Sequence, residues 1–480
     1  MEGLEITIYH FKEISEDNEE FRIDSEYYRK EYHSLYKKIG NNPMLVNLVS
    51  MADLSTNGSF KTVSNIIHDS NEKVISYIRS GNTGSLFINK SELQFISKEA
   101  HSRLPKSTTS LHDIIMARKG KIGGASIVTE EEVNFNCNEN VIKLTINQPE
   151  KLNPWYFAIY FNSKYGTKQI ERLATGNVQP WVSIFQIRKL KVHIASKKIQ
   201  SLISAIGINA HLHTKTSKKK YLEAENILLR TLNLVDFQYN SNPVNIKSFS
   251  NSFGTSGRLD AEFYQIKYEK LVERIKSSDY DNLTNLVHIE KSIEPGSKNY
   301  SEEGLPFVRV SDYNKFGLST PDKHLTDEFC KENAELIKNL KPKKETILFS
   351  KDGSVGTAYM LKEDADFITS GAVLHLTVKN KSKIIPEYLT LALNSKLVQM
   401  QAERDAGGSI ILHWRVNQIE NVIIPLVDFD IQREITDLVK ESFELKKQSE
   451  DLLEIAKTAV EIAIEQSEET AIDYINKHEK

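Results

Sequence analysis

The chain has 480 residues, of which 39% are hydrophobic and 9% aromatic, and its formal net charge is −3. This length exceeds what a single hydrophobic core organises, so we expect two or three folded domains. Two cysteines, Cys137 and Cys330, are too few for a disulfide framework or a cysteine-rich zinc site. Residues 1–5 lack the features of a signal peptide, and no apolar run is long enough to span a membrane. We therefore expect a cytoplasmic protein without a membrane partner.

The charge is distributed unevenly along the chain. Residues 151–250 contain 15 Lys and Arg against 4 Asp and Glu, and residues 401–480 contain 9 against 18, which gives local charges of +11 and −9. A basic surface of this kind suits contact with a polyanion. Two solvated helix faces would produce the same distribution, so charge alone does not decide between these interpretations.

The same sequence pattern occurs twice, about 235 residues apart. The segment Arg22–Tyr28 recurs as Arg258–Tyr264, and apolar residues at helical spacing predict that each opens an amphipathic helix. The apolar stretch in 113–123 recurs in 346–356, and each predicts a short strand that ends in a turn with two glycines. The offset changes only from 236 to 233 between these segments, which indicates an internal duplication.

Further segments continue the repeat in the same order. Pro154 and Pro386 each begin a predicted helix, because proline is favoured in the first helical turn. Strand-like segments follow at 187–192 and 419–424. Between the copies, residues 240–257 are rich in Asn, Ser and Gly and have the composition of a linker.

Each copy closes with a long segment whose apolar residues form one narrow stripe. The spacing predicts one helix over 196–235 and a second from Asp428 to about Asn476. Since each stripe needs a partner, we expect the two helices to pack antiparallel against each other. That arrangement would place one globular unit at each end, with a pseudo-twofold axis between the units.

Two kinds of loop in each copy offer groups for contact with a nucleic acid. Lysine side chains and backbone amides hold phosphates, and Asn, Gln, Ser and Arg side chains read base edges. The candidate contacts are Arg118, Lys119, Lys121, Asn177, Gln179, Trp181, Lys351, Ser354, Ser409, His413 and Arg415. An ordinary surface loop would account for each of these residues equally well.

The sequence offers no complete catalytic motif. Asn153-Pro154-Trp155-Tyr156 departs from the Asn/Asp-Pro-Pro-aromatic motif of amino-methyltransferases, and a proline-initiated helix explains it. There is no Gly-x-x-x-x-Gly-Lys-Ser/Thr loop for a nucleotide. His211 and His213 are two apart on a predicted helix and do not share a face that would hold a metal. Because no catalytic pair recurs in both copies, the sequence predicts binding rather than catalysis.

With the repeat laid out, the chain resembles the specificity subunit of type I restriction–modification systems over nearly its whole length. The segments that carry the resemblance are Arg258–Tyr264, Gly304–Ser311, Ile347–Gly356 and Ile431–Ile435. The first copy shows no clear counterpart of residues 304–311. The resemblance adds two further candidate DNA contacts in the second copy, Arg309 and Ser311.

The resemblance implies a mixed α+β fold, with target recognition domains at 1–195 and 236–427 and spacer helices at 196–235 and 428–480. Each domain would read one block of an asymmetric, bipartite site in double-stranded DNA. The subunit would be non-catalytic and would hold no metal or cofactor. It would recruit two modification subunits, which methylate adenine with S-adenosylmethionine, and restriction subunits with helicase and nuclease activity that use ATP and Mg²⁺. The expected docking stripe on the helices comprises Ile199, Ile203, Ile206, Ile431, Ile435, Leu438, Leu445 and Leu452.

Three alternatives stay open at this point. The chain would also fit the equivalent subunit of a related system whose partners cut and methylate as one fused protein. A stand-alone DNA adenine methyltransferase would need a cofactor loop, which the sequence does not show. A coiled-coil scaffold would use the two long helices without touching DNA.

Overall fold

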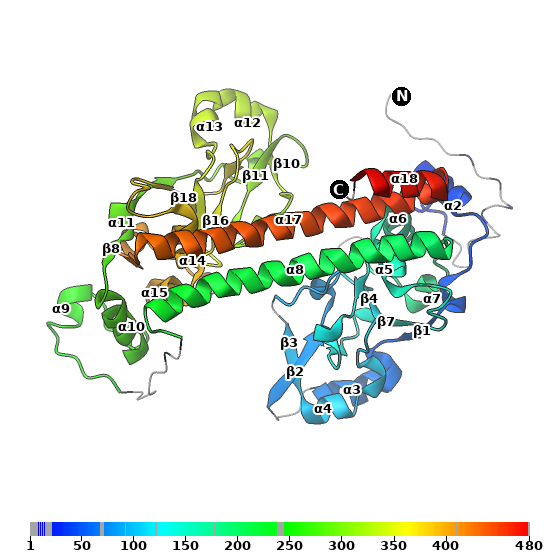
Figure 1. The fold of residues 1–480 in the computed structure, drawn as a ribbon, viewed down its shortest axis with the longest axis horizontal. Helices are drawn as coiled ribbons and strands as arrows, with labels where there is room; N and C mark the ends of the chain where they lie inside the picture. Colours follow the sequence, from blue (N-terminus) through cyan, green and yellow to red (C-terminus); the bar gives the residue numbers. More distant parts are fainter. Residues whose placement is uncertain are drawn as a thin grey trace. The chain divides into compact units, whose positions relative to one another are not determined.

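The computed structural model describes residues 8, 10, 12, 14, 22–67, 72–91, 93–120, 122–176, 179–235, 237, 244–408 and 410–478. The predicted DNA contacts Lys121, Asn177 and Ser409 lie outside these residues. The chain forms two compact units, both of mixed α and β structure (Figure 1). The first unit comprises 1–214 and 447–480, and the second comprises 215–446. The four-segment division expected from the sequence stays a prediction.

The first unit combines strands with short helices. Its helices are α2 (Lys30–Ile39), α3 (Phe60–Ile67), α4 (Lys98–Ser102), α5 (Pro154–Asn162), α6 (Lys164–Leu173), α7 (Ile184–Ile187) and α18 (Glu468–His478). Its strands are β1 (Val49–Ala52), β2 (Lys73–Ile78), β3 (Gln94–Ser97), β4 (Ile114–Ala117), β5 (Ser126–Ile127), β6 (Asn136–Cys137) and β7 (Val141–Ile146).

The second unit contains the corresponding elements and some additional short ones. Its helices are α9 (Phe253–Ser256), α10 (Ile266–Lys276), α11 (Leu283–Leu286), α12 (Asp327–Glu332), α13 (Ala334–Leu340), α14 (Pro386–Asn394), α15 (Lys396–Asp405) and α16 (Val416–Glu420). Its strands are β8 (Tyr280–Asn282), β9 (Val287–Lys291), β10 (Tyr300–Ser301), β11 (Leu305–Val308), β12 (Tyr313–Asn314), β13 (Gly317–Leu318), β14 (His324–Leu325), β15 (Ile347–Ser350), β16 (Ala358–Met360), β17 (Ile368–Thr369), β18 (Val373–Val378) and β19 (Ile423–Pro425).

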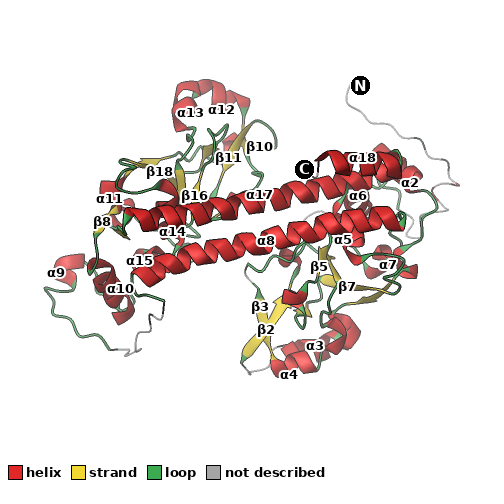
Figure 2. Cartoon of the chain, in the orientation of Figure 1, coloured by secondary structure: helices red, strands yellow, loops and turns green. Residues whose placement is uncertain are grey.

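Sheet topology confirms the duplication. The main sheet of the first unit has the strand order β1-β7-β4-β5, and that of the second has β9-β18-β15-β16, with all neighbours antiparallel. Figure 2 shows that each unit combines strands, in yellow, with helices, in red. A smaller sheet accompanies each: β3-β2-β6 and β10-β14-β11-β17. In both small sheets one pairing is parallel, β2 with β6 and β11 with β17. The two units are therefore copies of one fold.

Buried glutamines occupy equivalent places in the two copies. Gln200 accepts a hydrogen bond from the Asn153 amide at 2.8 Å, and Gln432 accepts one from the Ile385 amide at 3.1 Å. Each glutamine also donates to two backbone carbonyls, and both are at most 4% exposed. These bonds fix the entry to α5 and α14, since a buried backbone group without a partner is costly.

Two long helices contribute to both units. They are α8 (Lys197–Thr231) and α17 (Phe429–Glu465), and the first confirms the helix predicted at 196–235. In the second unit, Ser442 Oγ donates to the Ser217 carbonyl at 2.8 Å, and Glu441 pairs with Lys220 Nζ at 2.9 Å. In these contacts the residue number decreases along α17 as it increases along α8. The two helices are therefore antiparallel, as expected. In the first unit, Ser449 Oγ donates to the Ala210 carbonyl at 2.7 Å.

The close approach of α5 to α8 explains the glycine inside α8. A Cβ atom at Gly207 would lie 2.8 Å from Ile159 Cδ1 and 3.2 Å from Trp155 Cε3. Glycine costs roughly 1 kcal/mol relative to alanine inside a helix. Helix α5 is buried along nearly its whole length, from Trp155 to Phe161, so it packs on every side.

Three expectations about element boundaries are wrong. The segments Arg22–Tyr28 and Arg258–Tyr264 do not begin helices, which start only at Lys30 and Ile266. Instead, each arginine donates to carbonyls at the end of a helix: Arg22 Nη1 to Ala174 at 3.2 Å and Arg258 Nη1 to Asp405 at 3.0 Å. Helix ends leave such carbonyls without intrahelical partners, so the arginine side chains satisfy them.

The predicted C-terminal helix is also interrupted. It ends at Glu465, and α18 begins at Glu468, because Ser467 Oγ accepts a hydrogen bond from the Thr470 amide at 3.2 Å and starts a new helix. Of the predicted strand at 187–192, Ile187 ends α7, residues 188 and 189 form a turn, and only Lys191 is bridged, to Met44. Of the predicted strand at 419–424, only Ile423 and Ile424 belong to a strand, since α16 extends to Glu420. None of the described helices combines the length and hydropathy that a bilayer crossing needs.

Candidate functional site

Two predicted loops of the first unit meet beyond the end of β4. Trp181 pairs with Thr175 through two backbone hydrogen bonds of 2.9 and 3.0 Å, and it forms a bridge to Lys119. The Val182 amide donates to the Arg118 carbonyl at 2.8 Å. The turn after β4 and the loop after α6 therefore form one surface, although strands β5 to β7 and helices α5 and α6 separate them in the sequence.

A third segment, which contains Ser80, lies beside the turn after β4. Gly120 has φ +85°, and a Cβ atom there would lie 3.5 Å from Gln179 Nε2 and 3.7 Å from Ser80 Oγ. Ser80 begins the short 3-10 helix Ser80–Asn82 that follows β2. Glycine is required at 120 because side chains at this φ are strained. The first candidate site, comprising residues 79–80, 118–120 and 179–181, thus combines three loops.

The second unit repeats this geometry. His413 pairs with Gly407 through two backbone hydrogen bonds of 2.7 and 3.1 Å, and it forms a bridge to Asp352. The Trp414 amide donates to the Lys351 carbonyl at 2.7 Å. The second candidate site comprises residues 351–354 and 413–415.

The backbone pairing decides which aromatic residues are equivalent. His413 occupies the position of Trp181, and Trp414 occupies the position of Val182. Trp181 is 45% exposed, whereas Trp414 is 1% exposed and packs against Phe349 with a centroid distance of 5.8 Å. Trp414 is therefore a core residue, and of these two tryptophans only Trp181 is available for stacking.

The first copy does contain a counterpart of residues 304–311, contrary to the sequence expectation. Ile78 at the end of β2 pairs with parallel strand β6, as Val308 at the end of β11 pairs with β17. The next residue is an arginine in both: the Arg79 amide donates to Asn82 Oδ1 at 2.9 Å, and the Arg309 amide donates to Asp312 Oδ2 at 2.8 Å. Sequence reasoning missed Arg79, because the offset from Arg79 to Arg309 is smaller than the offset of the neighbouring segments.

Carboxylates already pair with two of the predicted cationic contacts. Arg118 Nη1 lies 2.5 Å from Asp53 Oδ2, whose side chain is 2% exposed. Lys351 pairs with Asp352, and Asp352 Oδ1 also accepts from His413 Nδ1 at 2.9 Å. A cation that neutralises a buried carboxylate is held in place and is less available to an outside anion.

The remaining predicted contacts differ in exposure. Lys119, Gln179, Ser354 and Arg415 are exposed, as are His413 and Trp181. Arg309 and Ser311 are half-buried or exposed beside Asp312, to which Arg309 Nε lies at 3.5 Å. Apart from Arg309 and Ser311, the structure thus brings the described candidates together in two loop clusters, one in each unit.

The predicted docking stripe is largely covered by the chain itself. Ile199, Ile203, Ile206 and Ile435 are completely buried in the cores of their units. The half-buried members are Ile431, Leu438, Leu445 and Leu452. These side chains hold the chain together, so a partner would contact other faces of the helices.

The methyltransferase-like segment is structural. Asn153 Oδ1 accepts hydrogen bonds from the Trp155 and Tyr156 amides at 2.9 and 3.4 Å, which caps α5. His211 packs against Trp155, with ring centroids 5.9 Å apart. Among the described residues, no group of three or more His, Cys, Asp and Glu side chains is placed to hold a metal ion.

The comparison with family models decides the family of the second copy. The model of the type I restriction modification DNA specificity domain matches residues 278–454. This segment belongs to the type I specificity-domain family. The match covers β8 to β19 and most of α17, and it includes the second candidate site. No match was found among curated protein sequences.

Solved structures with related descriptions are similar over most of the chain. The S subunit of a type I restriction–modification system from M. genitalium is 16% identical, with a TM-score of 0.40, over 87% of this chain and 94% of that chain. The HsdS subunit from Thermoanaerobacter tengcongensis is 14% identical, with a TM-score of 0.28, over 88% and 96%. A chain from a study of type I R-M complex assembly and conformational transition is 12% identical, with a TM-score of 0.27, over 89% and 99%.

Proposed function

We propose that the chain is the DNA-recognition subunit of a type I restriction–modification enzyme, and that each unit reads one block of an asymmetric, bipartite site. The match of the DNA specificity domain to residues 278–454 carries this proposal. The first unit, with the same main sheet and the same pairing of two loops, extends it to a second reading surface.

The two loop clusters supply different chemistry: Asp352 and His413 stand where Lys119 and Trp181 do in the first unit, and Arg415 stands where Ser183 does. The first presents Lys119, Gln179 and Trp181, and the second presents Asp352, His413 and Arg415. Amide and guanidinium groups read base edges, and lysine holds phosphates. Because the side chains differ, the two blocks of the DNA site should differ in sequence.

In this role the chain is non-catalytic and cytoplasmic. It would recruit two modification subunits that methylate adenine with S-adenosylmethionine, and restriction subunits that use ATP and Mg²⁺. A stand-alone adenine methyltransferase is not favoured, since Asn153, the one residue that suggested it, caps a helix. A subunit of a fused cut-and-methylate system would use the same reading surfaces.

The test is selection of binding sites from random double-stranded DNA by the full chain, assembled with its modification subunits. We expect two preferred blocks separated by unread bases. The double substitution Gln179→Ala with Trp181→Ala should relax the preference in one block, and Arg415→Ala should relax it in the other. Lys119→Ala should instead weaken binding to all sequences. It should also lower the steepness of log K plotted against log salt concentration by about 1.

Three results would contradict the proposal. The first is that the assembled complex shows no sequence preference. The second is that both sets of variants relax the preference in the same block. The third is that both sets of variants keep the full preference in both blocks. Ser85→Ala is a suitable control, because it alters a polar residue of the first unit outside the loop cluster.

A further inference from the structure

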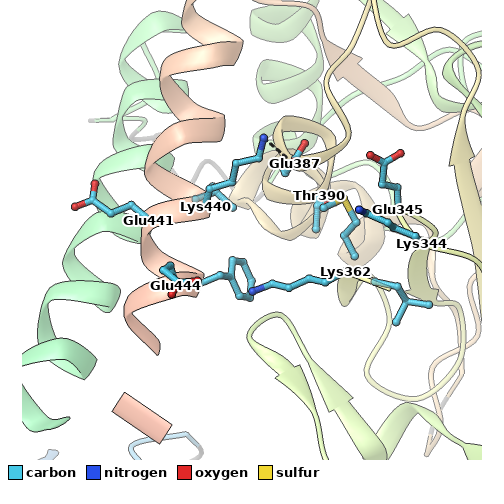
Figure 3. Close-up of a pocket in the computed structure, with 12 residues that line it drawn as sticks. Lys344, Glu345, Lys362, Glu387, Thr390, Lys440, Glu441 and Glu444 are labelled. Carbon is cyan, nitrogen blue, oxygen red and sulfur yellow. Dashed lines mark ion pairs between the residues drawn. The ribbon is translucent and has the colours of Figure 1, made fainter. Parts of the chain in front are cut away.

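A cavity of about 610 Å³ lies in the second unit between α17, α14 and β16 (Figure 3). Its apolar lining comes from Met360, Leu361, Val439 and Phe443. Lysine and glutamate side chains surround this lining and include Lys344 and Lys362. A concave, mostly apolar space of this size with a few charged groups is typical of a site for a small molecule.

The repeat places a filled core at the same position of the first unit. Trp155 and His211 align with Glu387 and Phe443, at the offset that also relates Pro154 to Pro386. The ring centroids of Trp155 and His211 lie 5.9 Å apart, and the ring of Phe87 lies 6.5 Å from Trp155 and 5.4 Å from His211. Trp155 is 7% exposed. In the first unit, therefore, an indole with two neighbouring rings occupies this space.

Strand register and helix packing support the equivalence. Ile127 of β5 and Met360 of β16 pair with equivalent residues of the central strands. Val439 of α17 aligns with Gly207 of α8 at the same offset. A Cβ atom at Gly207 would lie 3.2 Å from Trp155 Cε3, so the indole reaches the helix backbone there, whereas the buried Val439 side chain takes up part of that space in the second unit and lines the cavity.

Glu387 leaves the corresponding space in the second unit open. Its carboxylate pairs with Lys440 Nζ at 3.1 Å, as Figure 3 shows. A flexible glutamate directed toward a lysine does not replace a planar indole. Phe443 is the one aromatic residue among those that line the cavity, so no second ring packs beside it as Trp155 packs beside His211.

The lysines around the cavity indicate the charge of its ligand. Lys362 Nζ lies 5.1 Å from the ring centroid of Phe443, within the range of a cation–π contact. Lys344 is a second ammonium group on the lining. Three of the four lining carboxylates, Glu345, Glu387 and Glu441, pair with Lys381, Lys440 and Lys220, and the fourth is Glu444. An acidic group that enters beside Lys344 would meet the positive charge of that ammonium group.

We propose that this cavity binds a small planar aromatic molecule that carries an acidic group. The ring lies against Phe443 and Met360, in the place that Trp155 fills in the first unit, and methionine sulfur packs favourably on aromatic rings. The acidic group lies near Lys344 and Lys362. This inference concerns a surface away from the loop clusters and does not depend on the proposed DNA recognition.

The test uses indole-3-acetate as the probe, titrated into the full chain by calorimetry. We expect saturable binding with one site per chain. Glu387→Trp restores the residue type of the first unit and should abolish binding, whereas Glu387→Gln keeps the cavity open and should retain it. Lys344→Gln should weaken binding of indole-3-acetate roughly tenfold, the effect of losing one charge-assisted contact. It should leave binding of neutral 3-methylindole unchanged.

Several outcomes would overturn the inference. The cavity is not the site if the native chain binds neither probe, or if Glu387→Trp binds indole-3-acetate as well as the native chain. If 3-methylindole binds as tightly as indole-3-acetate, the acidic group plays no part. Circular dichroism should show Glu387→Trp to be folded. If it is not, Thr390→Phe fills the cavity from α14, and binding that survives this change also refutes the site.

Discussion

Replacing Trp414 by alanine should lower the free energy of unfolding of the second unit far more than Trp181→Ala lowers that of the first unit. Trp414 is 1% exposed and packs against Phe349, so its removal leaves a cavity in the core. Burial of a tryptophan removes roughly 150–250 Å² from water, which at about 25 cal/mol per Å² contributes about 4–6 kcal/mol. Measured Trp-to-Ala losses in cores are about 3–5 kcal/mol.

Two matched variants separate packing from other effects. Trp414 Nε1 is buried without a hydrogen-bond partner among the described residues, so Trp414→Phe gives up no hydrogen bond and should cost less than about 1.5 kcal/mol. Trp181 is 45% exposed, and Trp181→Ala should change the free energy of unfolding by only about 0.5 kcal/mol.

Urea unfolding followed by two signals provides the assay. The chain has 3 tryptophans, and Trp155 and Trp181 both belong to the first unit. In Trp414→Ala, tryptophan fluorescence therefore reports the first unit alone, while circular dichroism reports both. We expect a large early loss of ellipticity without an equal shift of the fluorescence transition. A native-like ellipticity curve for Trp414→Ala, or an equal loss in Trp181→Ala, would refute the assignment of Trp414 to the core.

Three further predictions concern stability. Gln432→Leu should lower the free energy of unfolding of the second unit by about 3 kcal/mol, because it leaves buried backbone groups such as the Ile385 amide without partners; a urea midpoint equal to the native one would contradict this. Burial lowers the pKa of His375 to about 4, so stability should be complete above pH 6.5 and fall by about 3 kcal/mol as the pH drops to 4; His375→Asn should flatten that dependence in urea titrations. Hydrogen bonding to Lys164 lowers the pKa of Glu465 to about 2, so its contribution to the first unit should be present above pH 4.5 and lost toward pH 2, and acid unfolding of Glu465→Gln should lack this component.

Much of the fold could be predicted because the duplication leaves local patterns in the sequence. The proline-initiated helices, the central strands and α8 all follow from apolar spacing within a few residues. Apolar spacing could not predict the turn at Arg22 or the interruption of the C-terminal helix at Ser467. Arg22 is fixed by carbonyls at the end of α6, far away in the sequence, and Ser467 ends a helix whose apolar spacing continues beyond it.

The candidate site was predicted in part. Sequence comparison found the two loops of each unit, but only the backbone hydrogen bonds show that His413 stands where Trp181 does. Arg79 escaped detection because a change of offset hides its equivalence to Arg309. Contacts between segments far apart in sequence, such as Ser80 beside Gly120, have no local signal.

The composition of the two units has a consequence for synthesis on the ribosome. The core of the first unit includes Ala456, Ala459, Ala471 and Ile475, which are translated after every residue of the second unit. The second unit is the continuous segment 215–446 and has all of its residues before then. Domains usually complete folding in N-terminal to C-terminal order during translation. Here the order should be reversed, because the first unit is complete only after residues 447–480 have followed the second unit.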